Sequence, residues 1–272
     1  MITLVPKDNF KLPVEGKNVT PDIFSEKSVK EIKALEMWEG NRKRTIGELF
    51  DVIDDGISSE EFTIKIEGNI GSVRNIGAQM SKGKIIVDGD VGMHLGEAMT
   101  GGTIAVSGNA GSWAGSRMKD GTIEIKGNAG DYIGAAYRGS TEGMNGGKII
   151  IHGNAGHEVG CFMRGGLIKI LGNVGIFAGI HMRGGTIFVQ GVSQGRAGAQ
   201  MKRGKIVLAG QSDDVLPTFT IEEIKAKVKV DGEKIEGPLY RFTGDMADNG
   251  KGKLFVAKQP NSYLSFYEKY LD

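Results

Sequence analysis

The sequence predicts an all-β protein, a right-handed parallel β-helix solenoid of about seven to eight coils with small mixed α/β caps at both ends. The motif G-x-x-M-x-x-G-x-I-x-V-x-G recurs along the chain, mostly with a period of 19 residues, and a fixed period of this length is typical of solenoids. Aliphatic residues alternate with varied residues inside each repeat, which indicates strands with one buried face. Glycine accounts for 44 of the 272 residues, and this frequency is incompatible with helical repeats.

Two kinds of core column recur in register along the repeats. Each unit carries a methionine, then a strand-opening glycine three residues later, then aliphatic residues two and four positions beyond that glycine. The methionines are Met80, Met99, Met118, Met144, Met163, Met182 and Met201, and the first aliphatic column is Ile85, Ile104, Ile123, Ile149, Ile168, Ile187 and Ile206. Coils stacked about 4.8 Å apart turn these columns into continuous core ladders.

A Gly-Asn pair marks the turn that follows most of the strands. It occurs at Gly68-Asn69, Gly108-Asn109, Gly127-Asn128, Gly153-Asn154 and Gly172-Asn173, while Val192 and Gln211 take the place of asparagine in the last repeats. Both residue types tolerate left-handed backbone, and an asparagine side chain bonds nearby main chain, so we expect corners here. The fourth repeat spans 26 residues instead of 19, and we expect its seven extra residues, between Gly134 and Met144, to bulge outward as a loop.

The chain divides into three predicted parts. Residues 61–211 form the repeat domain, residues 1–60 an N-terminal capping segment, and residues 212–272 a C-terminal capping or docking segment. Caps are expected because the ends of a β-helix expose unpaired strand edges.

The flanking segments contain several predicted helices. Residues 25–35 have an amphipathic pattern that should end near Gly40, and residues 45–50 have a capping box formed by Thr45 and Glu48. Residues 220–224 are expected to open another helix, and residues 262–270 to form a terminal helix or docking segment.

Composition excludes several classes of function. The net charge of +1 gives no overall field for nucleic acid or membrane, and no segment resembles a membrane span or a secretory signal. Cys161 is the only cysteine, so an intrachain disulfide and a cysteine-based zinc or iron–sulfur site are excluded. We expect a soluble cytoplasmic protein without nucleic-acid or membrane partners.

The repeats offer no arrangement of residues typical of catalysis. The four histidines, His94, His152, His157 and His181, share no repeat position and have no acidic or cysteine partner at metal-ligand spacing. Cys161 lies four residues from His157, and a packed thiol is the favoured interpretation. The outer strand positions carry no carboxylate pair, which disfavours a carbohydrate-active β-helix enzyme. We therefore assign no catalytic, cofactor-binding or metal-binding residue to this chain.

Three groups of residues are candidates for docking a partner. The first is an apolar row on the outward strand face, the second is a basic column that follows the methionines, and the third is the loop of the fourth repeat. The alternative for the apolar row is that the terminal segments of this same chain cover it. These groups are, in the same order, Ile86, Ile150, Phe188 and Val207; Lys119, Arg164, Arg183 and Lys202; and Tyr137 and Arg138.

The repeats, over about residues 64–211, resemble those of the C subunit of formylmethanofuran dehydrogenase. The same repeat motif is also similar to that of the C-terminal β-helix domain of the glutamate synthase large subunit. The segments Thr243-Gly244-Asp245 and 250–254 fit the first family, and the chain has no amidotransferase or flavin-binding portion. Thr141 departs from the motif, where a glycine is expected. The alternative is a β-helix domain or subunit of a glutamate synthase-type amidotransferase.

The first resemblance implies a non-catalytic scaffold subunit of an oxidoreductase complex. Such a complex couples reversible CO2 reduction with ferredoxin electrons to N-formylation of methanofuran, the first step of methanogenesis from CO2. In that family a catalytic subunit holds molybdopterin with molybdenum or tungsten, an amidohydrolase-like subunit holds a metal-dependent site, and further subunits hold iron–sulfur clusters. The resemblance places none of these cofactors on this chain.

Overall fold

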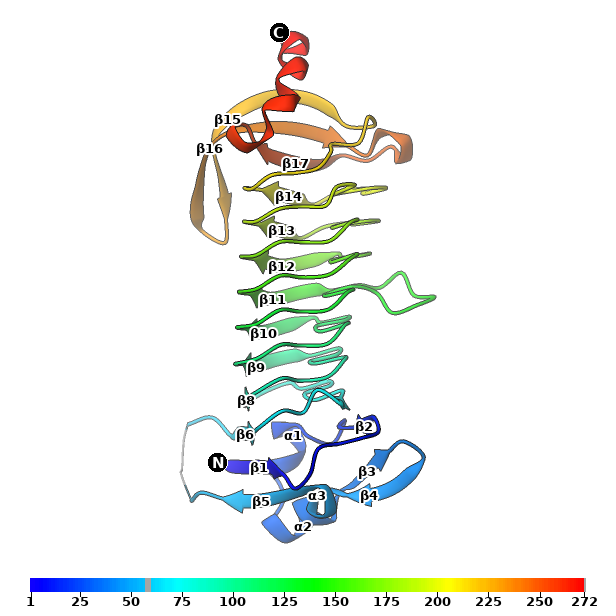
Figure 1. The fold of residues 1–272 in the computed structure, drawn as a ribbon, viewed down its shortest axis with the longest axis vertical. Helices are drawn as coiled ribbons and strands as arrows, with labels where there is room; N and C mark the ends of the chain where they lie inside the picture. Colours follow the sequence, from blue (N-terminus) through cyan, green and yellow to red (C-terminus); the bar gives the residue numbers. More distant parts are fainter. Residues whose placement is uncertain (57–59, 272) are drawn as a thin grey trace.

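The strands of the repeats lie side by side and form the body of a rod (Figure 1). A computed structural model describes residues 1–56 and 60–271 of the chain. The repeat strands are β8 (Lys84–Asp88), β9 (Thr100–Val106), β10 (Asp120–Ile125), β11 (Asn145–Ile151), β12 (Gly165–Ile170), β13 (Thr186–Val189) and β14 (Lys205–Leu208). Each pairs in parallel with the next, and the column from Ile85 to Ile206 is paired residue for residue. The structure is therefore mostly β, with a long, mostly parallel sheet of the kind found in β-helix-like folds.

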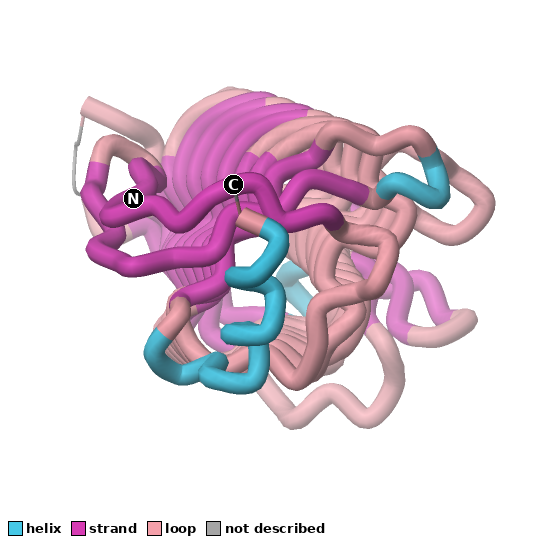
Figure 2. The backbone as a smooth tube through the Cα atoms, turned by 90° about the horizontal axis from the view of Figure 1, so that it is seen from above, coloured by secondary structure: helices cyan, strands magenta, loops and turns pink. Residues whose placement is uncertain are grey.

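Each coil makes a second parallel contact on its opposite side. Single-residue bridges connect successive coils there, running from Ile70 through Val91, Ala110, Ala129, Ala155, Val174 and Ser193 to Ser212. Seen along the rod, the strands superpose on one side and the turns on the other (Figure 2). The two sets of contacts hold the coils in register, which the 19-residue period predicts.

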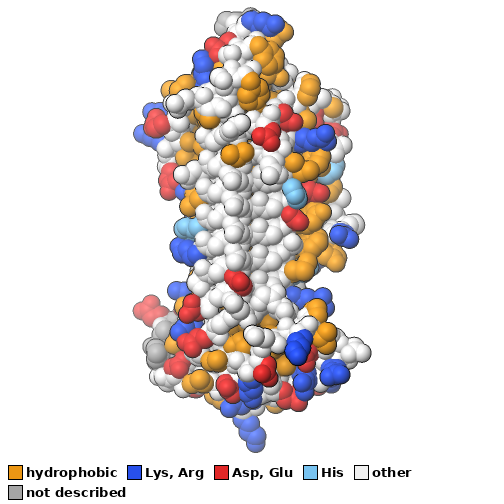
Figure 3. Space-filling model, in the orientation of Figure 1, with side chains coloured by type: hydrophobic (Ala, Val, Ile, Leu, Met, Phe, Trp, Pro, Cys, Tyr) orange, Lys and Arg blue, Asp and Glu red, His pale blue; other side chains and the backbone are white. Residues whose placement is uncertain are grey.

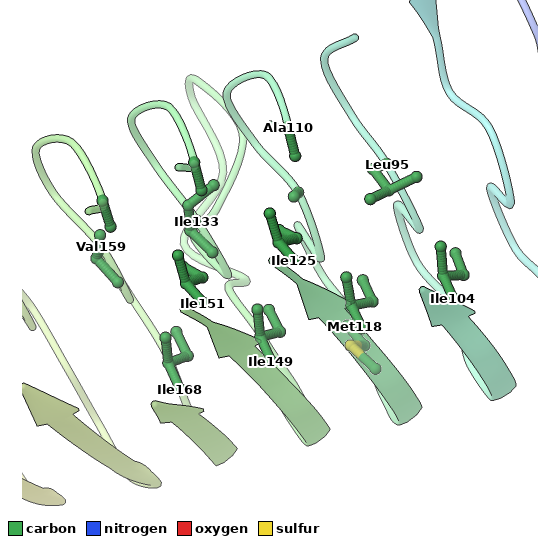
Figure 4. Packing of buried hydrophobic residues seen from close by; sticks show 14 of the residues in the cluster. Leu95, Ile104, Ala110, Met118, Ile125, Ile133, Ile149, Ile151, Val159 and Ile168 are labelled. Atoms are coloured by element: carbon green, nitrogen blue, oxygen red, sulfur yellow. The ribbon is translucent and has the colours of Figure 1, made fainter. Parts of the chain in front are cut away.

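The space between the two contacts is filled by the predicted ladders (Figure 4). The methionines and the first aliphatic column are fully buried, and so are Leu95, Ala114 and Ile133 on other parts of the coils. Burying one such aliphatic side chain contributes about 1.5–3 kcal/mol, and the contribution repeats in every coil. The prediction that these columns form the core is confirmed.

The Gly-Asn corner works differently from the sequence-based expectation. The asparagines do not have left-handed backbone; instead, each side chain accepts a hydrogen bond from the backbone N–H of the equivalent residue one coil further on. Asn109 Oδ1 accepts from Asn128, Asn128 from Asn154 and Asn154 from Asn173, each at 2.8 Å. The asparagine column is therefore a hydrogen-bonded ladder between coils.

The glycine of the pair is required by the close approach of neighbouring coils. A Cβ atom added to Gly127 would lie 2.6 Å from both the carbonyl oxygen of Gly108 and Oδ1 of Asn109. Left-handed backbone occurs at other positions of the coils, among them His94, Trp113 and Tyr132.

Short strands and helices of the N-terminal part lie at one end of the rod (Figure 1). These are β1 (Ile2–Pro6), β2 (Val14–Glu15), α1 (Pro21–Phe24), α2 (Val29–Ala34), β3 (Glu36–Glu39), β4 (Arg42–Thr45), α3 (Ile46–Leu49) and β5 (Phe50–Asp54). β6 (Thr63–Glu67) and β7 (Val73–Arg74) follow within the predicted repeat domain, and β6 pairs in parallel with β8. The first helix predicted here is shorter than expected. It starts after Ser28 and ends at Ala34, because the following residues pair as β3 with β4 and bury Met37. The capped helix after Thr45 is confirmed as α3, with both hydrogen bonds of its capping box.

The C-terminal part lies at the other end and contains β15 (Thr220–Val230), β16 (Glu233–Gly244), β17 (Gly252–Ala257) and the 3₁₀ helices η1 (Met246–Asp248) and η2 (Gln259–Tyr270). The predicted helix at residues 220–224 is wrong. These residues begin β15, which pairs antiparallel with β16 in a long hairpin. The predicted terminal helix is present as η2.

Strands of the two terminal segments extend the same sheet. It contains 13 strands in the order β15-β16-β17-β14-β13-β12-β11-β10-β9-β8-β6-β1-β5, while β4, β3, β2 and β7 form a separate small sheet. The outermost strands at both ends are antiparallel to their neighbours. The division into residues 1–60, 61–211 and 212–272 stays a prediction.

Candidate functional site

The outward face of the parallel sheet carries the predicted apolar row, and the structure divides this row into two parts. Ile86 and Ile150 are half-buried, whereas Phe188 is 3% exposed and Val207 is fully buried. Phe188 and Val207 pack with Val228, Val230 and Leu239 of the β15–β16 hairpin in a second, smaller core. A partner therefore has no access to Phe188 and Val207 in this structure, because the chain itself covers them.

Two ion pairs connect the tip of this hairpin to the coils. Lys148 Nζ of β11 lies 2.6 Å from a carboxylate oxygen of Asp231, and Lys169 Nζ of β12 lies 2.7 Å from one of Glu233. These bonds fix the hairpin along the outward face, with its end over β11 and β12.

The four cations of the predicted basic column do not act as one patch. Arg164 donates to the carbonyl oxygen of Thr141 at 3.1 Å, and Lys202 lies 3.2 Å from a carboxylate oxygen of Asp248. Arg183 stacks over the ring of Phe162, as described below, and Lys119 is exposed with no ion-pair partner among the described residues. Most of the column is therefore occupied by contacts within the chain.

The loop of the fourth repeat contacts a stack of aromatic rings that the sequence analysis missed. His94, Trp113 and Tyr132 lie in successive coils with nearly parallel rings, and their centroids are 5.4 and 4.6 Å apart. Tyr137 of the loop meets the Trp113 ring edge-on at 5.7 Å, and the Arg138 guanidinium lies 5.9 Å from the same ring. The structure thus brings the two predicted loop residues together on one aromatic surface.

A sequence signal for this stack exists. His94, Trp113 and Tyr132 are separated by 19 residues each, so they occupy one position of the repeat. A search for that spacing among the variable positions, as well as among the repeated ones, would have found them.

A pocket of about 610 Å³ lies beside the stack and is formed by three separate parts of the chain. Lys17 and Asp22 come from the N-terminal segment, His94, Glu97 and Arg117 from the coils, and Tyr137 from the loop. The pocket is therefore a product of tertiary structure.

The acidic groups of this pocket are already paired. Glu97 bonds to Arg117, and its carboxylate lies 3.1 Å from Nδ1 of His94. The close approach of the His94 imidazole, opposed by burial and reinforced by Arg117, holds the pKa of Glu97 below its usual value. Burial raises the pKa of Asp22, but hydrogen bonds from Ser81 outweigh it and leave the pKa lowered. Both groups are carboxylates at neutral pH, which suits ion pairing rather than proton donation.

The other titratable groups considered from the sequence have structural partners as well. Nε2 of His152 lies 2.8 Å from a carboxylate oxygen of Glu124, and Lys126 binds the same oxygen. Cys161 is buried, and its desolvation, with a further contribution from Glu158, raises the pKa of the thiol to about 12. Within residues 1–56 and 60–271, no group of three or more His, Cys, Asp or Glu side chains is placed to hold a metal ion.

None of the helices in the described part of the chain is long and apolar enough to cross a membrane.

The comparisons with known proteins identify the family. No family model matches the chain. It is 48% identical over 265 residues to the C subunit of the tungsten-containing formylmethanofuran dehydrogenase 2 of Methanococcus maripaludis, covering 95% of this chain and 97% of that protein. It is also 44% identical over 93 residues to the C subunit of the molybdenum-containing formylmethanofuran dehydrogenase 1 of Methanothermobacter marburgensis, where the match spans 34% of this chain and 23% of that relative's length.

A solved structure extends the similarity to three dimensions. One chain of the formyltransferase/hydrolase complex (FhcABCD) from Methylorubrum extorquens, crystallised with methylofuran, superposes with a TM-score of 0.83 at 35% identity. The superposition covers 94% of this chain and 99% of that one. Of the two resemblances that the repeat motif suggested, the sequence and structural matches support the first, and the chain belongs to the family of formylmethanofuran dehydrogenase C subunits.

Proposed function

We propose that this chain is a non-catalytic scaffold subunit of a formylmethanofuran dehydrogenase complex. The complex would couple reversible CO2 reduction, with electrons from ferredoxin, to N-formylation of methanofuran in the cytoplasm. The observation that carries the proposal is the match along almost the full length of a C subunit.

The shape proposed for the scaffold is a right-handed parallel β-helix between two caps. Support for the coil comes from the two sets of parallel contacts between successive repeats and from the columns of core residues. Residues 1–60 and 212–272 would act as caps, since antiparallel strands and short helices terminate the sheet there.

The donor chemistry of the chain does not fit the cofactors that the family implies. An iron–sulfur cluster requires several thiolates, and the single thiol, Cys161, is buried with a pKa of about 12. His94 and His152 are engaged with Glu97 and Glu124. Molybdopterin with molybdenum or tungsten, the iron–sulfur clusters and the amidohydrolase metal site would therefore lie on other subunits, and these subunits are the proposed partners.

The experiment is affinity purification of the chain, tagged at its C-terminus, from its native host. We expect larger subunits to co-purify with molybdenum or tungsten, with iron, and with formylmethanofuran-dependent reduction of an electron acceptor. The same tag on Val207→Asp, which disrupts the core under the hairpin, controls for nonspecific capture. Recovery of the folded chain alone, without metal or activity, would contradict the proposal.

A second measurement separates a scaffold from a catalytic role. Glu97→Gln, Glu124→Gln and Cys161→Ser remove the acidic and thiol groups of the coils whose pKa is shifted from its usual value. Each variant should assemble and keep its activity per complex within about twofold, since none of these groups would take part in the reaction. Normal assembly with a loss of activity of about tenfold or more, in any of the three, would show that this chain contributes to catalysis.

A further inference from the structure

Aromatic side chains gather along one corner of the rod, which we call the aromatic corner. Its rings are those of His94, Trp113, Tyr132, Phe162, Phe177 and His181, and all six residues have left-handed backbone, with φ between 55° and 65°. Besides the stack already described, Phe162 and His181 stack with centroids 4.5 Å apart. Figure 3 shows hydrophobic side chains and a histidine gathered along one edge of the middle coils. Bulky residues are strained in this conformation, which glycine adopts freely, so the rings are placed here at a cost in backbone energy.

Three arginines lie against the rings of this corner. Arg138 lies 5.9 Å from the Trp113 ring, Arg183 5.7 Å from the Phe162 ring and Arg196 5.4 Å from the Phe177 ring. A guanidinium that stacks by its face still has its N–H groups directed outward at its edge, where they can bind a carboxylate with two parallel hydrogen bonds.

None of these three guanidiniums has a carboxylate partner in the part of the chain that the structure describes. All three side chains are exposed. Five other arginines do form ion pairs within the chain, namely Arg44, Arg74, Arg117, Arg164 and Arg241. Arg42 and Arg203 form no ion pair among the described residues either, so the aromatic corner is distinguished by arginines that lack a carboxylate and lie against rings.

Exposed apolar side chains complete this surface. Met93 precedes His94 and is 41% exposed, Ile176 precedes Phe177 and is 37% exposed, and Tyr137 is 46% exposed. Exposed apolar groups with tyrosine, tryptophan and arginine are the composition of the energetic centre of a protein interface. Burying the three arginines in such an interface requires carboxylates opposite them, because an unpaired buried charge is strongly destabilising.

We propose that the aromatic corner docks an acidic surface of another protein subunit, whose carboxylates bind the edges of Arg138, Arg183 and Arg196. This inference rests on the proposed function for the existence of a complex, and it adds the surface and the chemistry of the partner. The rings and the exposed apolar side chains supply buried area, and the three arginines select a partner by charge.

Charge reversal tests the proposal. The variant Arg138→Glu, Arg183→Glu, Arg196→Glu should fold normally, since the side chains are exposed, but its recovery of the complex from the host should fall on the order of tenfold or more. The control variant Lys27→Glu, Lys30→Glu, Lys227→Glu makes the same change in net charge on the N-terminal cap and the hairpin, and should assemble like the wild type. Circular dichroism and thermal melting of the free chains verify folding.

A charge-preserving variant identifies the partner atoms. In Arg138→Lys, Arg183→Lys, Arg196→Lys the new amines can be joined by a zero-length carbodiimide to any carboxylate in contact. Mass spectrometry of the cross-linked complex should find amide bonds from these lysines to aspartate or glutamate of another subunit. This variant also keeps the proposal testable if the glutamate variant does not fold.

The outcomes distinguish the two proposals. If the wild-type chain recovers no complex, the proposed function is wrong. If the wild type recovers the complex and the glutamate variant does so equally well, the proposed function stands and the docking surface is wrong. Cross-links absent from all three lysines in an assembled complex would also overturn the docking surface.

Discussion

The outward face of the parallel sheet is covered over β12–β14 and open over β8–β10, although both regions have the same repeat and the same register. Phe188 and Val207 pack under the β15–β16 hairpin, whereas Ile86 and Ala105, at the same position of their coils, are half-exposed and line a shallow apolar pocket of about 230 Å³. The difference shows that the repeat determines which way a side chain points, while a distant segment determines whether that side chain is buried.

The charged residues at the edges of the two regions differ in the same way. At the edge of the covered region, Lys148 of β11 and Lys169 of β12 bind acidic residues of the hairpin. In the open region, Glu124 binds Lys126 and His152 of the neighbouring strand edges. The covered region therefore uses its charges to hold another part of the chain, and the open region pairs them locally.

A charge under the hairpin should have the largest effect on this comparison. Val207→Asp places a carboxylate at a fully buried position, and the free energy of unfolding should fall by about 3–5 kcal/mol because the charge has no partner. Ala105→Asp makes a similar change at the equivalent open position and should cost less than about 1 kcal/mol. Chemical denaturation followed by circular dichroism measures both values. Equal losses would mean that the hairpin does not distinguish the two regions.

Truncating side chains of the apolar row should give the next largest difference in stability between the covered and open regions. Phe188→Ala removes a buried ring and should lower the free energy of unfolding by about 3–5 kcal/mol through lost burial and a cavity. Ile86→Ala, in the open region, should lose only about 1 kcal/mol, since the side chain is already half-exposed. The same denaturation experiment compares them, and a loss for Ile86→Ala as large as that for Phe188→Ala would show that this region is covered as well.

The stability that the asparagine ladder contributes should not depend on whether the hairpin covers the coil. Asn128 accepts a hydrogen bond from Asn154 N–H at 2.8 Å in the middle coils, and Asn173 accepts one from Val192 N–H at 2.7 Å in the covered coils. Asn128→Ala and Asn173→Ala should each lower the free energy of unfolding by about 1 kcal/mol. Clearly unequal losses in thermal melts of the two variants would show that the corners depend on the cover of the opposite face.

The smallest effect on stability should come from the charged residues at the edge of the open region. The hydrogen bond from Lys126, followed by that from His152, holds the pKa of Glu124 below its usual value of 4.5. A lowered pKa in the folded state means that its stabilising effect is present above pH 4.5 and is lost as the pH falls through the folded-state pKa. The melting temperature of the wild type should therefore exceed that of Glu124→Gln at about pH 7, and the gap should close in acid. A gap that is unchanged between about pH 7 and pH 3 would exclude this role for the ion pair.

Much of the fold was predictable because each repeat contains the residues that determine how it packs against its neighbours. The period of 19 residues sets the coil, the alternation of aliphatic residues sets the buried face, and the methionine column fills the centre, so each coil needs only its neighbours to be understood. The capping box at Thr45 was equally readable, because its hydrogen bonds span only three residues.

The candidate site was less predictable, because its parts are brought together from separate segments. Tyr137 and Arg138 were predicted as docking residues from their types alone, but their contacts with Trp113 depend on how the loop folds back over the coils. The ring stack was missed because its residues occupy a variable position of the repeat, where histidine, tryptophan and tyrosine replace one another.

The sequence by itself determined the repeat, the core ladders and the membership of the parallel sheet, since all of these follow from local periodicity. Only the tertiary structure decided that residues 220–230 form a strand, that this hairpin covers Phe188 and Val207, and that the aromatic corner keeps three arginines without carboxylate partners among the residues described. The physical reason is that a long-range contact depends on which segment reaches a surface, and neither periodicity nor local propensity contains that information.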